Sequence, residues 1–297
     1  MNSRAPDWSL YRSFLAVLRD HSLSGAARSL NLTQPTLARH IAALEEQLGF
    51  ELFTRSQQGL APTEAALTLM PYAQSIEGNA AGLLRAASGI GQTVEGTVRI
   101  TASEIMGAEV LPSMLGKLRE THPGLEFELV LSNTVDNLLR RDADIAVRMV
   151  EPIQEALVVK KLGSVTVGLY AHKDYLKRAG KPSTIKELSR RSMIGFDQET
   201  PALRAMRARI PASNMLHFAF RADSDIAQLQ AIRAGFGIGF CQTGLAKREP
   251  ALVRVLADAI GLKLGIWLVM HENLRSTPRC RAVFDGLATE LSIYADR

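Results

Sequence analysis

The chain has 297 residues, of which 46% are hydrophobic and 22% are charged, and its formal net charge is +5. This length accommodates two domains, or three if one is small, and can bury a sizeable core. The chain holds no run of eighteen apolar residues and its N-terminus, MNSRAPDW, lacks a signal-peptide pattern, so we expect a cytoplasmic protein that does not span a membrane.

Apolar residues at helical spacing predict an opening helix, whose shared face holds Leu10, Tyr11, Phe14, Val17 and Leu18. Ser24 is expected to cap a short second helix. Asn31 stands where the chain must turn sharply, and asparagine tolerates the left-handed conformation better than most residues. These features predict two helices and a tight turn that leads into a third.

Thr33 is expected to cap the third helix, and Pro35 falls in its first turn, where a missing N–H costs little. Three- and four-residue steps predict the buried face of this helix: Leu37, Ile41, Leu44 and Leu48. Polar side chains remain near the N-terminal end, from which a recognition helix contacts bases: Gln34, Thr36, Arg39 and His40. An ordinary helical subdomain has the same periodicity, so this pattern alone leaves both interpretations open.

The residues after the third helix indicate a β-hairpin, with strands at 51–54 and 60–62 and a turn at 56–59. A hairpin directly after a recognition helix makes a winged helix-turn-helix, in which Arg55 is placed to meet phosphate or a minor groove. Residues 1–62 contain six Arg and five acidic residues, a net charge of only +1. DNA binding therefore depends on the placement of Arg28, Arg39 and Arg55 on one surface.

A long helix is predicted from Thr63, a plausible N-cap, to about residue 87. Pro71 should kink or divide it. A lone helix of this length cannot bury its apolar residues within its own chain, so pairing with a partner helix is the simpler interpretation, and a core helix is the alternative. The segment SGIGQT at 88–93 indicates a hinge, because two glycines close together break a helix.

Strands and helices alternate downstream, which predicts parallel α/β sheets. A helix is expected at about 104–121, and another from Ser276 to the end, returning to the first part of this fold. Strands are expected at 98–102, 127–131, 145–149, 165–170, 218–222, 237–240 and 265–270.

Ligands of open α/β sheets bind at the carboxyl ends of strands, where this chain has several polar side chains. The Ser103 hydroxyl and the N–H groups of Glu104 and Ile105 can form an anion site, or Ser103 can cap its own helix. Arg148 can clamp a carboxylate or pair with a structural acid such as Asp144. The candidate effector-binding residues are Ser103, Glu104, Ile105, Ser132, Asn133, Arg148, Phe196, Asp197, Gln198, Ser224 and Asp225.

The run AARSLNLTQPTLARHIAALEEQLGFELFTR, followed by LAPTEAA, EGTVRITAS, ADIAVR and DSDIAQLQAIRAGFGIGF in that order, resembles LysR-type transcriptional regulators over nearly the full length. The resemblance implies an α/β protein with an N-terminal winged helix-turn-helix (1–62), a long linker or dimerisation helix and hinge (63–90), and a two-lobed, periplasmic-binding-protein-like effector domain (91–297). Lobe I is expected at about 91–163 and 268–297 and lobe II at about 164–267, with breaks near Gly163 and Trp267.

The resemblance also implies a function: a sequence-specific regulator on double-stranded DNA, a homodimer or homotetramer reading an interrupted inverted repeat. A small, anionic organic effector would bind between the lobes, and RNA polymerase would be a further partner. The candidate DNA-binding residues are Arg28, Thr33, Gln34, Pro35, Thr36, Arg39, His40 and Arg55. Two positions depart from the family pattern: Ala38 replaces the usual Ser, which removes one polar contact to DNA, and Ala66 replaces a common Gly, which a helix tolerates.

The alternative is a helix-turn-helix protein fused to an unrecognised enzymatic or protein-interaction domain. Because of Ala38, a further alternative is an interaction module whose DNA-reading domain, the reading head, no longer binds DNA. Motifs of hydrolases, P-loops and zinc proteases are absent from the sequence, and the run from Gly235 to Gly239 fits a tight turn better than a dinucleotide loop. We therefore expect no catalytic site, cofactor or metal. Cys241 and Cys280 are expected as two buried thiols, with a redox-sensing pair as the alternative.

Overall fold

The structure, a computed structural model, describes residues 6–56, 59–88, 93–133, 143–152, 157–200, 203–204, 208 and 216–295. These residues form two compact units, one that extends to Leu84 and one that begins at Arg85. The centre of the predicted hairpin turn, 57–58, and the glycines of the predicted hinge, within 89–92, lie outside the described residues.

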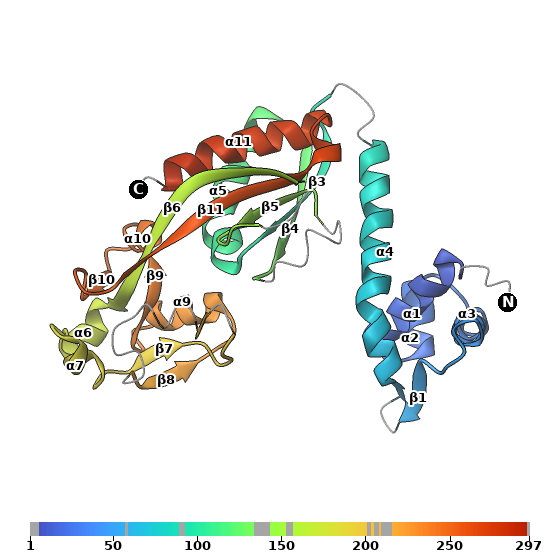
Figure 1. The fold of residues 1–297 in the computed structure, drawn as a ribbon, viewed down its shortest axis with the longest axis horizontal. Coiled ribbons are helices and arrows are strands. Elements are labelled where there is room, and N and C mark those ends of the chain that lie inside the picture. Colours follow the sequence, from blue (N-terminus) through green and yellow to red (C-terminus); the bar gives the residue numbers. More distant parts are fainter. Residues whose placement is uncertain are drawn as a thin grey trace. The chain divides into compact units, whose positions relative to one another are not determined.

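The first unit opens with three helices around one apolar core: α1 (Trp8–Asp20), α2 (Leu23–Ser29) and α3 (Gln34–Leu48) (Figure 1). The predicted buried face of α3 is confirmed for Leu37, Ile41 and Leu44, while Leu48 is half-buried. Asn31 has the expected positive φ of 53°. Thr33 caps α3 as predicted, because its hydroxyl accepts a hydrogen bond from the Thr36 N–H at 3.3 Å.

The predicted cap of α2 is wrong by two residues. Ser22, rather than Ser24, accepts the hydrogen bond of a first-turn N–H, that of Gly25, at 3.0 Å. Ser22 has the extended backbone that an N-cap requires, whereas Ser24 already lies inside the helix. Ser24 instead donates to the Gln34 side chain at 3.1 Å.

A two-stranded hairpin follows, made of β1 (Phe53–Ser56) and β2 (Gly59–Pro62). The first strand begins two residues later than the predicted 51–54. The Glu45 carboxylate of α3 accepts hydrogen bonds from the backbone N–H groups of Leu52 and Phe53, and this contact holds the chain against α3 where the strand would otherwise have started. A Cβ on Gly59 would lie 2.6 Å from the His21 carbonyl oxygen. Glycine is therefore required where β2 touches the turn between α1 and α2.

Helix α4 (Glu64–Ser88) follows the wing directly. The Thr63 hydroxyl accepts from the Ala66 N–H at 3.2 Å, which confirms the predicted cap. Of the two effects expected of Pro71, a kink or a division, the division is wrong, since α4 is continuous through it (Figure 1), and the kink stays a prediction. A proline removes only one helical hydrogen bond, and the packing of Leu69 and Ala73 against the preceding helices holds both sides of the position in place. Ala66 is fully buried in the same core.

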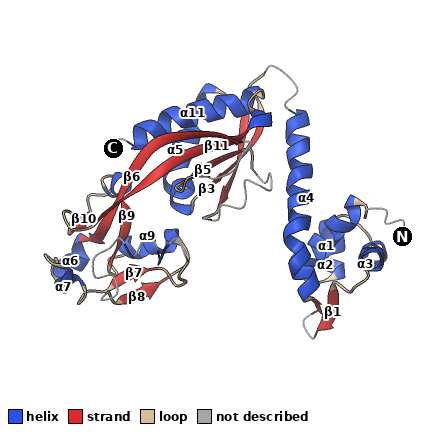
Figure 2. Ribbon diagram, viewed as in Figure 1, coloured by secondary structure: helices blue, strands red, loops and turns tan. Residues whose placement is uncertain are grey.

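In the second unit, the described strands from β3 to β11 form one sheet (Figure 2). Its order is β4-β3-β5-β11-β6-β9-β7-β8, and β10 pairs with β6. The strands are β3 (Gly96–Ala102), β4 (Leu125–Leu131), β5 (Ile145–Arg148), β6 (Leu157–His172), β7 (Met193–Gly195), β8 (Phe218–Arg221), β9 (Ile238–Gln242), β10 (Leu252–Val255) and β11 (Gly261–His271).

The sheet is mixed, which corrects the prediction of parallel sheets. The strands β3, β4 and β5 pair in parallel, as do β7, β8 and β9, but the long strands β6 and β11 between these two groups are antiparallel to each other and to their neighbours. We call the β3–β5 end lobe I and the β7–β10 end lobe II. The register of β6 with β11 shifts between Ile266 and Trp267, opposite Gly163, whose φ is +124°.

Helices cover the sheet in both lobes. In lobe I the predicted helix at 104–121 is confirmed, but its first part is a π-helical turn (Met106–Val110) before α5 (Leu111–Thr121). The final helix α11 (Pro278–Ala295) lies along β6 and β11 and returns to lobe I, as expected (Figure 1). The remaining helices are α6 (Lys173–Ala179), α7 (Ile185–Leu188), α9 (Asp225–Arg233), α10 (Thr243–Ala246) and the 3-10 turn Glu272–Leu274.

Among the described helices, including the 25-residue α4, none combines the length and the apolar character that a bilayer span requires.

Candidate DNA-binding surface and effector cleft

The N-terminal turn of α3 presents a polar tip to solvent. Gln34, Pro35 and Arg39 are exposed, and Thr36 is half-buried beside them. The Thr33 and Thr36 hydroxyls lie 2.8 Å apart, and the Arg39 guanidinium approaches the Thr36 hydroxyl at 3.5 Å. The first turn contains no acidic residue, so the positive end of the helix dipole faces solvent without a local counter-charge. Such a tip is suited to contact an anionic, hydrogen-bonding surface.

Two serines outside α3 position members of this tip. Ser24 on α2 binds the Gln34 amide. Ser13, fully buried on α1, lies 2.7 Å from His40 Nδ1. His40 is therefore held against α1 and half-buried rather than fully free on the outer face, and only its other ring nitrogen remains available to a partner. Neither contact was predicted, since nothing in the spacing of Ser13 and Ser24 along the sequence shows which side chain each of them meets.

The other two predicted DNA contacts come from neighbouring elements. Arg28 is exposed on α2, and Arg55 is exposed on β1 of the wing, opposite Leu60. Both belong to the same compact unit as α3. The predicted set thus spans the second helix, the third helix and the wing.

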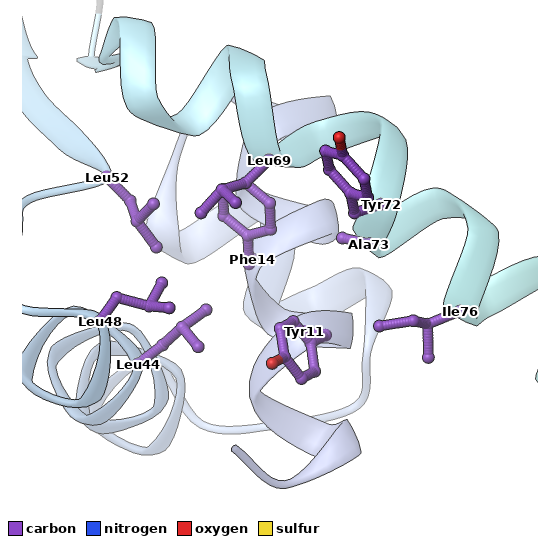
Figure 3. A pocket seen from close by; sticks show the side chains of 9 residues that line it. All are labelled: Tyr11, Phe14, Leu44, Leu48, Leu52, Leu69, Tyr72, Ala73 and Ile76. Carbon is purple, nitrogen blue, oxygen red and sulfur yellow. The ribbon is translucent and has the colours of Figure 1, made fainter. Parts of the chain in front are cut away.

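An apolar pocket of about 140 Å³ lies where α4 crosses the helices of the first unit (Figure 3). Side chains from α1, α3 and α4 point toward the same space in this view. The lining residues are Tyr11, Phe14, Leu44, Leu48, Leu52, Leu69, Tyr72, Ala73 and Ile76. Because α4 contributes four of them, its direction is set by packing against the helices that carry the polar tip.

An exposed apolar stripe on α4 starts at the pocket, with Tyr72 and Ile76, and continues past it. Tyr72 is 69% exposed, Leu83 67% and Leu84 69%, and Ile76 lies between them at 40%. Tyr72, Ile76 and Leu83 follow one another at four- and seven-residue steps, which places them on one face of the helix. Large apolar side chains at this exposure and spacing indicate a helix that pairs with another helix.

In the second unit, the predicted residues at the ends of β3, β4 and β8 come together between the lobes. The Glu104 N–H donates to Asn133 Oδ1 at 3.1 Å, and Asn133 Nδ2 donates to Asp225 Oδ2 at 2.9 Å. The Ser224 hydroxyl, which caps α9, donates to the Glu104 carboxylate at 2.8 Å. Burial raises the pKa of the Asp225 carboxyl, the hydrogen bond from Asn133 lowers it, and the nearby Glu104 raises it further.

The predicted anion site at Ser103 is corrected in one respect. The Glu104 N–H is not free, because Asn133 accepts its hydrogen bond. The alternative, a Ser103 cap, is not observed either, since the Ser103 hydroxyl makes no hydrogen bond within the described residues. Ser103 and Ile105 are both half-buried. What remains at this position is an unused hydroxyl beside a carboxylate rather than a cluster of free N–H donors.

Arg148 is buried, with 4% of its surface exposed, and lacks an acidic partner within the described residues. Its guanidinium donates to the Ser132 carbonyl at 3.2 Å and to the Thr101 hydroxyl at 3.0 Å. The suggested pair with Asp144 is wrong, because the Asp144 carboxylate accepts from the Arg99 N–H instead. Burial lowers the pKa of Arg148 to about 10, so it remains a buried cation whose hydrogen-bond partners among the described residues are neutral.

Phe196, Asp197 and Gln198 follow β7 as predicted, with Phe196 half-buried and the other two exposed. Among the residues that the structure describes, none of the three is hydrogen-bonded to the Glu104–Asp225 cluster. Within the described residues, the hydrogen bonds from lobe II to this cluster come from the start of α9 and not from the end of β7.

The two cysteines, Cys241 and Cys280, are both buried, and they are not joined in a disulfide. Burial raises the pKa of the Cys241 thiol to about 12. A thiol in this state is a poor nucleophile, which favours the structural interpretation over redox sensing. In the described part of the chain, His, Cys, Asp and Glu side chains form no group of three suited to a metal ion.

A winged helix-turn-helix with an exposed polar tip and a two-lobed α/β unit with a polar cluster between its lobes together define a class: DNA-binding regulators that carry a ligand-binding domain. The comparisons with known proteins agree. Residues 8–67 match the bacterial regulatory helix-turn-helix of the lysR family, and residues 91–292 match the LysR substrate binding domain. The chain therefore belongs to the family of LysR-type transcriptional regulators.

Individual relatives are distant. The chain is 27% identical to an HTH-type transcriptional regulator of Xanthomonas campestris pv. campestris, over 95% of this chain and 85% of the relative. It is similar in fold to CrgA of Neisseria meningitidis (TM-score 0.59, 23% identity, 96% and 98% of the two chains). Full-length CbnR in complex with its target DNA is also similar in fold (TM-score 0.66, 18% identity, 96% and 99%).

Proposed function

We propose that the polar tip of α3 reads the bases of an operator in double-stranded DNA, and that a small organic anion bound between the lobes modulates this binding. The observation that carries the proposal is the division of α3 into two faces. Leu37, Ile41 and Leu44 are buried in the core, Arg39 projects from the opposite face, and Gln34 is exposed at the N-terminal end of the helix. This is how a recognition helix enters a major groove.

Within this proposal the residues have separate roles. Gln34, Thr36, Arg39 and His40 face bases, with His40 limited to the nitrogen that Ser13 leaves free. Arg28 and Arg55, together with the N-terminal turn of α3 at Thr33 and Pro35, meet phosphates. The solved complex of CbnR with its target DNA, a structure of the same fold, supports a DNA-binding role for this architecture.

Pairing through the exposed stripe on α4 would give a homodimer or homotetramer. A net charge of +1 over residues 1–62 provides little general attraction to DNA, so two reading heads on one duplex supply affinity that one head lacks. Heads related by two-fold symmetry read an interrupted inverted repeat, with half-sites roughly 34–36 Å apart.

We assign residues 1–62 to the DNA-binding domain, 63–90 to the linker helix and hinge, and 91–297 to the effector domain. The effector would bind between lobes I and II of this last domain. Arg148 is a buried cation whose partners in the part of the chain that the structure describes are neutral, which supports an anionic group on the effector. Ser103, Ile105, Ser132 and the residues after β7 would contact the rest of the molecule. The protein would act without catalysis in the cytoplasm, where RNA polymerase is available as a partner.

The test compares Arg39→Ala with Arg55→Ala in gel-shift titrations on the operator and on scrambled duplexes. Arg39→Ala is expected to weaken the free energy of binding to the operator by about 1–3 kcal/mol and to relax the preference at one base position. Arg55→Ala is expected to weaken binding equally on all duplexes and to reduce the slope of log affinity against log salt by about 0.9.

The matched control is Arg119→Ala, which removes an exposed arginine from α5 in the second unit and should change neither quantity. Identical losses for Arg39→Ala and Arg55→Ala on every duplex would overturn the assignment of base reading to α3.

A further inference from the structure

The π-helical turn Met106–Val110 of lobe I is contacted by side chains of lobe II. Gln242 of β9 donates to the Met106 sulfur at 3.7 Å, and Arg248 donates to the Glu109 carbonyl at 3.3 Å. Two acidic side chains lie at this turn: Glu104 precedes it by two residues, and Glu109 is part of it. Both carboxylates reach across to α9.

The spacing of these two acids depends on the π-helical geometry. Residues five apart on an ordinary α-helix point in directions about 140° apart, because the helix has 3.6 residues per turn. A π-helical turn is wider, with hydrogen bonds from i to i+5, as between the Leu111 N–H and the Met106 carbonyl. It therefore brings Glu109 closer to the face that Glu104 occupies. Such turns are concentrated at functional sites.

Glu104 holds the start of α9. One of its carboxylate oxygens accepts from the Ser224 hydroxyl at 2.8 Å and from the Ile226 N–H at 3.3 Å. Asn133 adds a second bridge to the same end of the helix through Asp225. The neighbouring Asp225 carboxylate opposes Glu104 electrostatically, which weakens this end of the contact.

Glu109 holds the other end of α9. Arg233, the last residue of the helix, donates to both Glu109 oxygens at 2.7 Å and to Glu249 at 2.6 Å. The Glu109 and Glu249 carboxylates surround the guanidinium and raise the pKa of Arg233 above its ordinary value. A two-oxygen contact to an arginine is geometrically fixed, so this end is the firmer of the two.

We propose that Glu104 and Glu109 form a latch that keeps the lobes closed on each other without an effector. Glu109 and Arg233 act as the pivot, and Glu104 is the releasable end. This inference rests on the proposed function only in assigning the latch to effector control: an effector that approaches Arg148 and Asn133 competes for the groups that Glu104 joins. Releasing Glu104 would let α9 swing about Arg233, and lobe II would move with it.

The test measures the distance between the lobes in the full-length protein. Spin labels are placed at Arg119→Cys on α5 and Lys186→Cys on α7, both exposed, while the native Cys241 and Cys280 are buried. Labelled chains are diluted into unlabelled protein, and pulsed electron paramagnetic resonance gives the distribution of distances within one chain. The parent protein is expected to show one narrow population.

Glu104→Ala removes both acceptor contacts and is expected to create a second population of label-to-label distances. This second population should be at least fivefold larger than any minor population that the parent protein shows. Glu104→Gln keeps an oxygen that accepts from Ser224 and Ile226 and is expected to restore the narrow distribution. Glu109→Ala is expected to broaden the distribution further, because it frees the pivot. Glu120→Ala, an exposed acid on α5, is the matched control and should change nothing.

A Glu104→Ala distribution that matches the parent overturns the latch, and so does a Glu104→Gln distribution as open as that of Glu104→Ala. Circular dichroism identifies any variant that does not fold. If Glu104→Ala does not fold, Glu104→Gln alone decides: a distance distribution like that of the parent supports the latch, and an open one overturns it. Because neither DNA nor effector is present, the result is independent of DNA binding, which gel shifts on the same preparations measure separately.

Discussion

Arg148 carries a charge that its surroundings do little to stabilise. It is buried, and its hydrogen bonds within the described residues go to one carbonyl and one hydroxyl. A buried ion without a counter-charge costs free energy, and such costs are tolerated where they serve binding. This is the physical reason for assigning Arg148 to an effector anion rather than to the stability of lobe I.

Two substitutions and their combination test this assignment. Thr101→Val keeps the shape of a fully buried side chain but removes the acceptor of one Arg148 hydrogen bond, and is expected to lower the free energy of unfolding by about 1–3 kcal/mol. Arg148→Met is expected to change the free energy of unfolding little, because the buried charge leaves with the side chain. In the double variant, most of the loss from Thr101→Val should be regained.

Urea unfolding of the four proteins gives this double-mutant cycle directly. A large loss of stability from Arg148→Met alone would show that Arg148 stabilises the fold, and the effector assignment would lose its main support. Losses that simply add in the double variant would show that Thr101 and Arg148 do not interact.

At this scale the sequence predicted some details and not others. Thr33, Asn31 and Thr63 were identified correctly because a cap or a turn depends on the residue type and its immediate neighbours. Ser24 was assigned wrongly because two serines stand within three positions and only the backbone conformation distinguishes them. Partners such as Ser13 for His40 are far apart in the sequence and leave no local signal.

Helix α4 is the element whose exposed face most clearly calls for a partner. Leu83→Glu places a charge in the apolar stripe and is expected to raise the dimer dissociation constant at least roughly 10-fold, because burying one leucine contributes about 1.5–3 kcal/mol. Sedimentation velocity across a concentration series measures the change.

Gln74→Glu adds the same charge nine residues earlier, on the opposite side of the helix, and should leave the dissociation constant as it is. Equal effects of the two variants would mean that charge rather than the stripe governs association.

Element types were predictable and their arrangement was not. Each predicted strand is present, because periodicity and β-branched residues act locally. The antiparallel direction of β6 and β11 depends on which strands meet in space, and alternation along the chain does not encode it. The π-helical turn also escaped prediction, since the sequence of 104–121 reads as one ordinary helix.

For the whole molecule, order along the chain was the most informative property. A reading head, a long helix and an α/β domain, each weak evidence alone, together predicted the architecture that the family comparisons support. The contacts between the lobes were beyond prediction: Glu104 and Ser224 are 120 positions apart, and Glu109 and Arg233 are 124 apart. Net charge was uninformative, because the reading head is nearly neutral.

In vitro selection from random duplexes tests the central claim, that the tip of α3 reads bases, most directly. If the tip of α3 reads bases, the purified protein enriches an interrupted inverted repeat whose half-site centres are roughly 34–36 Å apart. The variant Gln34→Ala is then expected to enrich the same repeat with one position in each half-site made degenerate. Failure of the parent protein to enrich any sequence, or an identical selected site for Gln34→Ala, would contradict the claim.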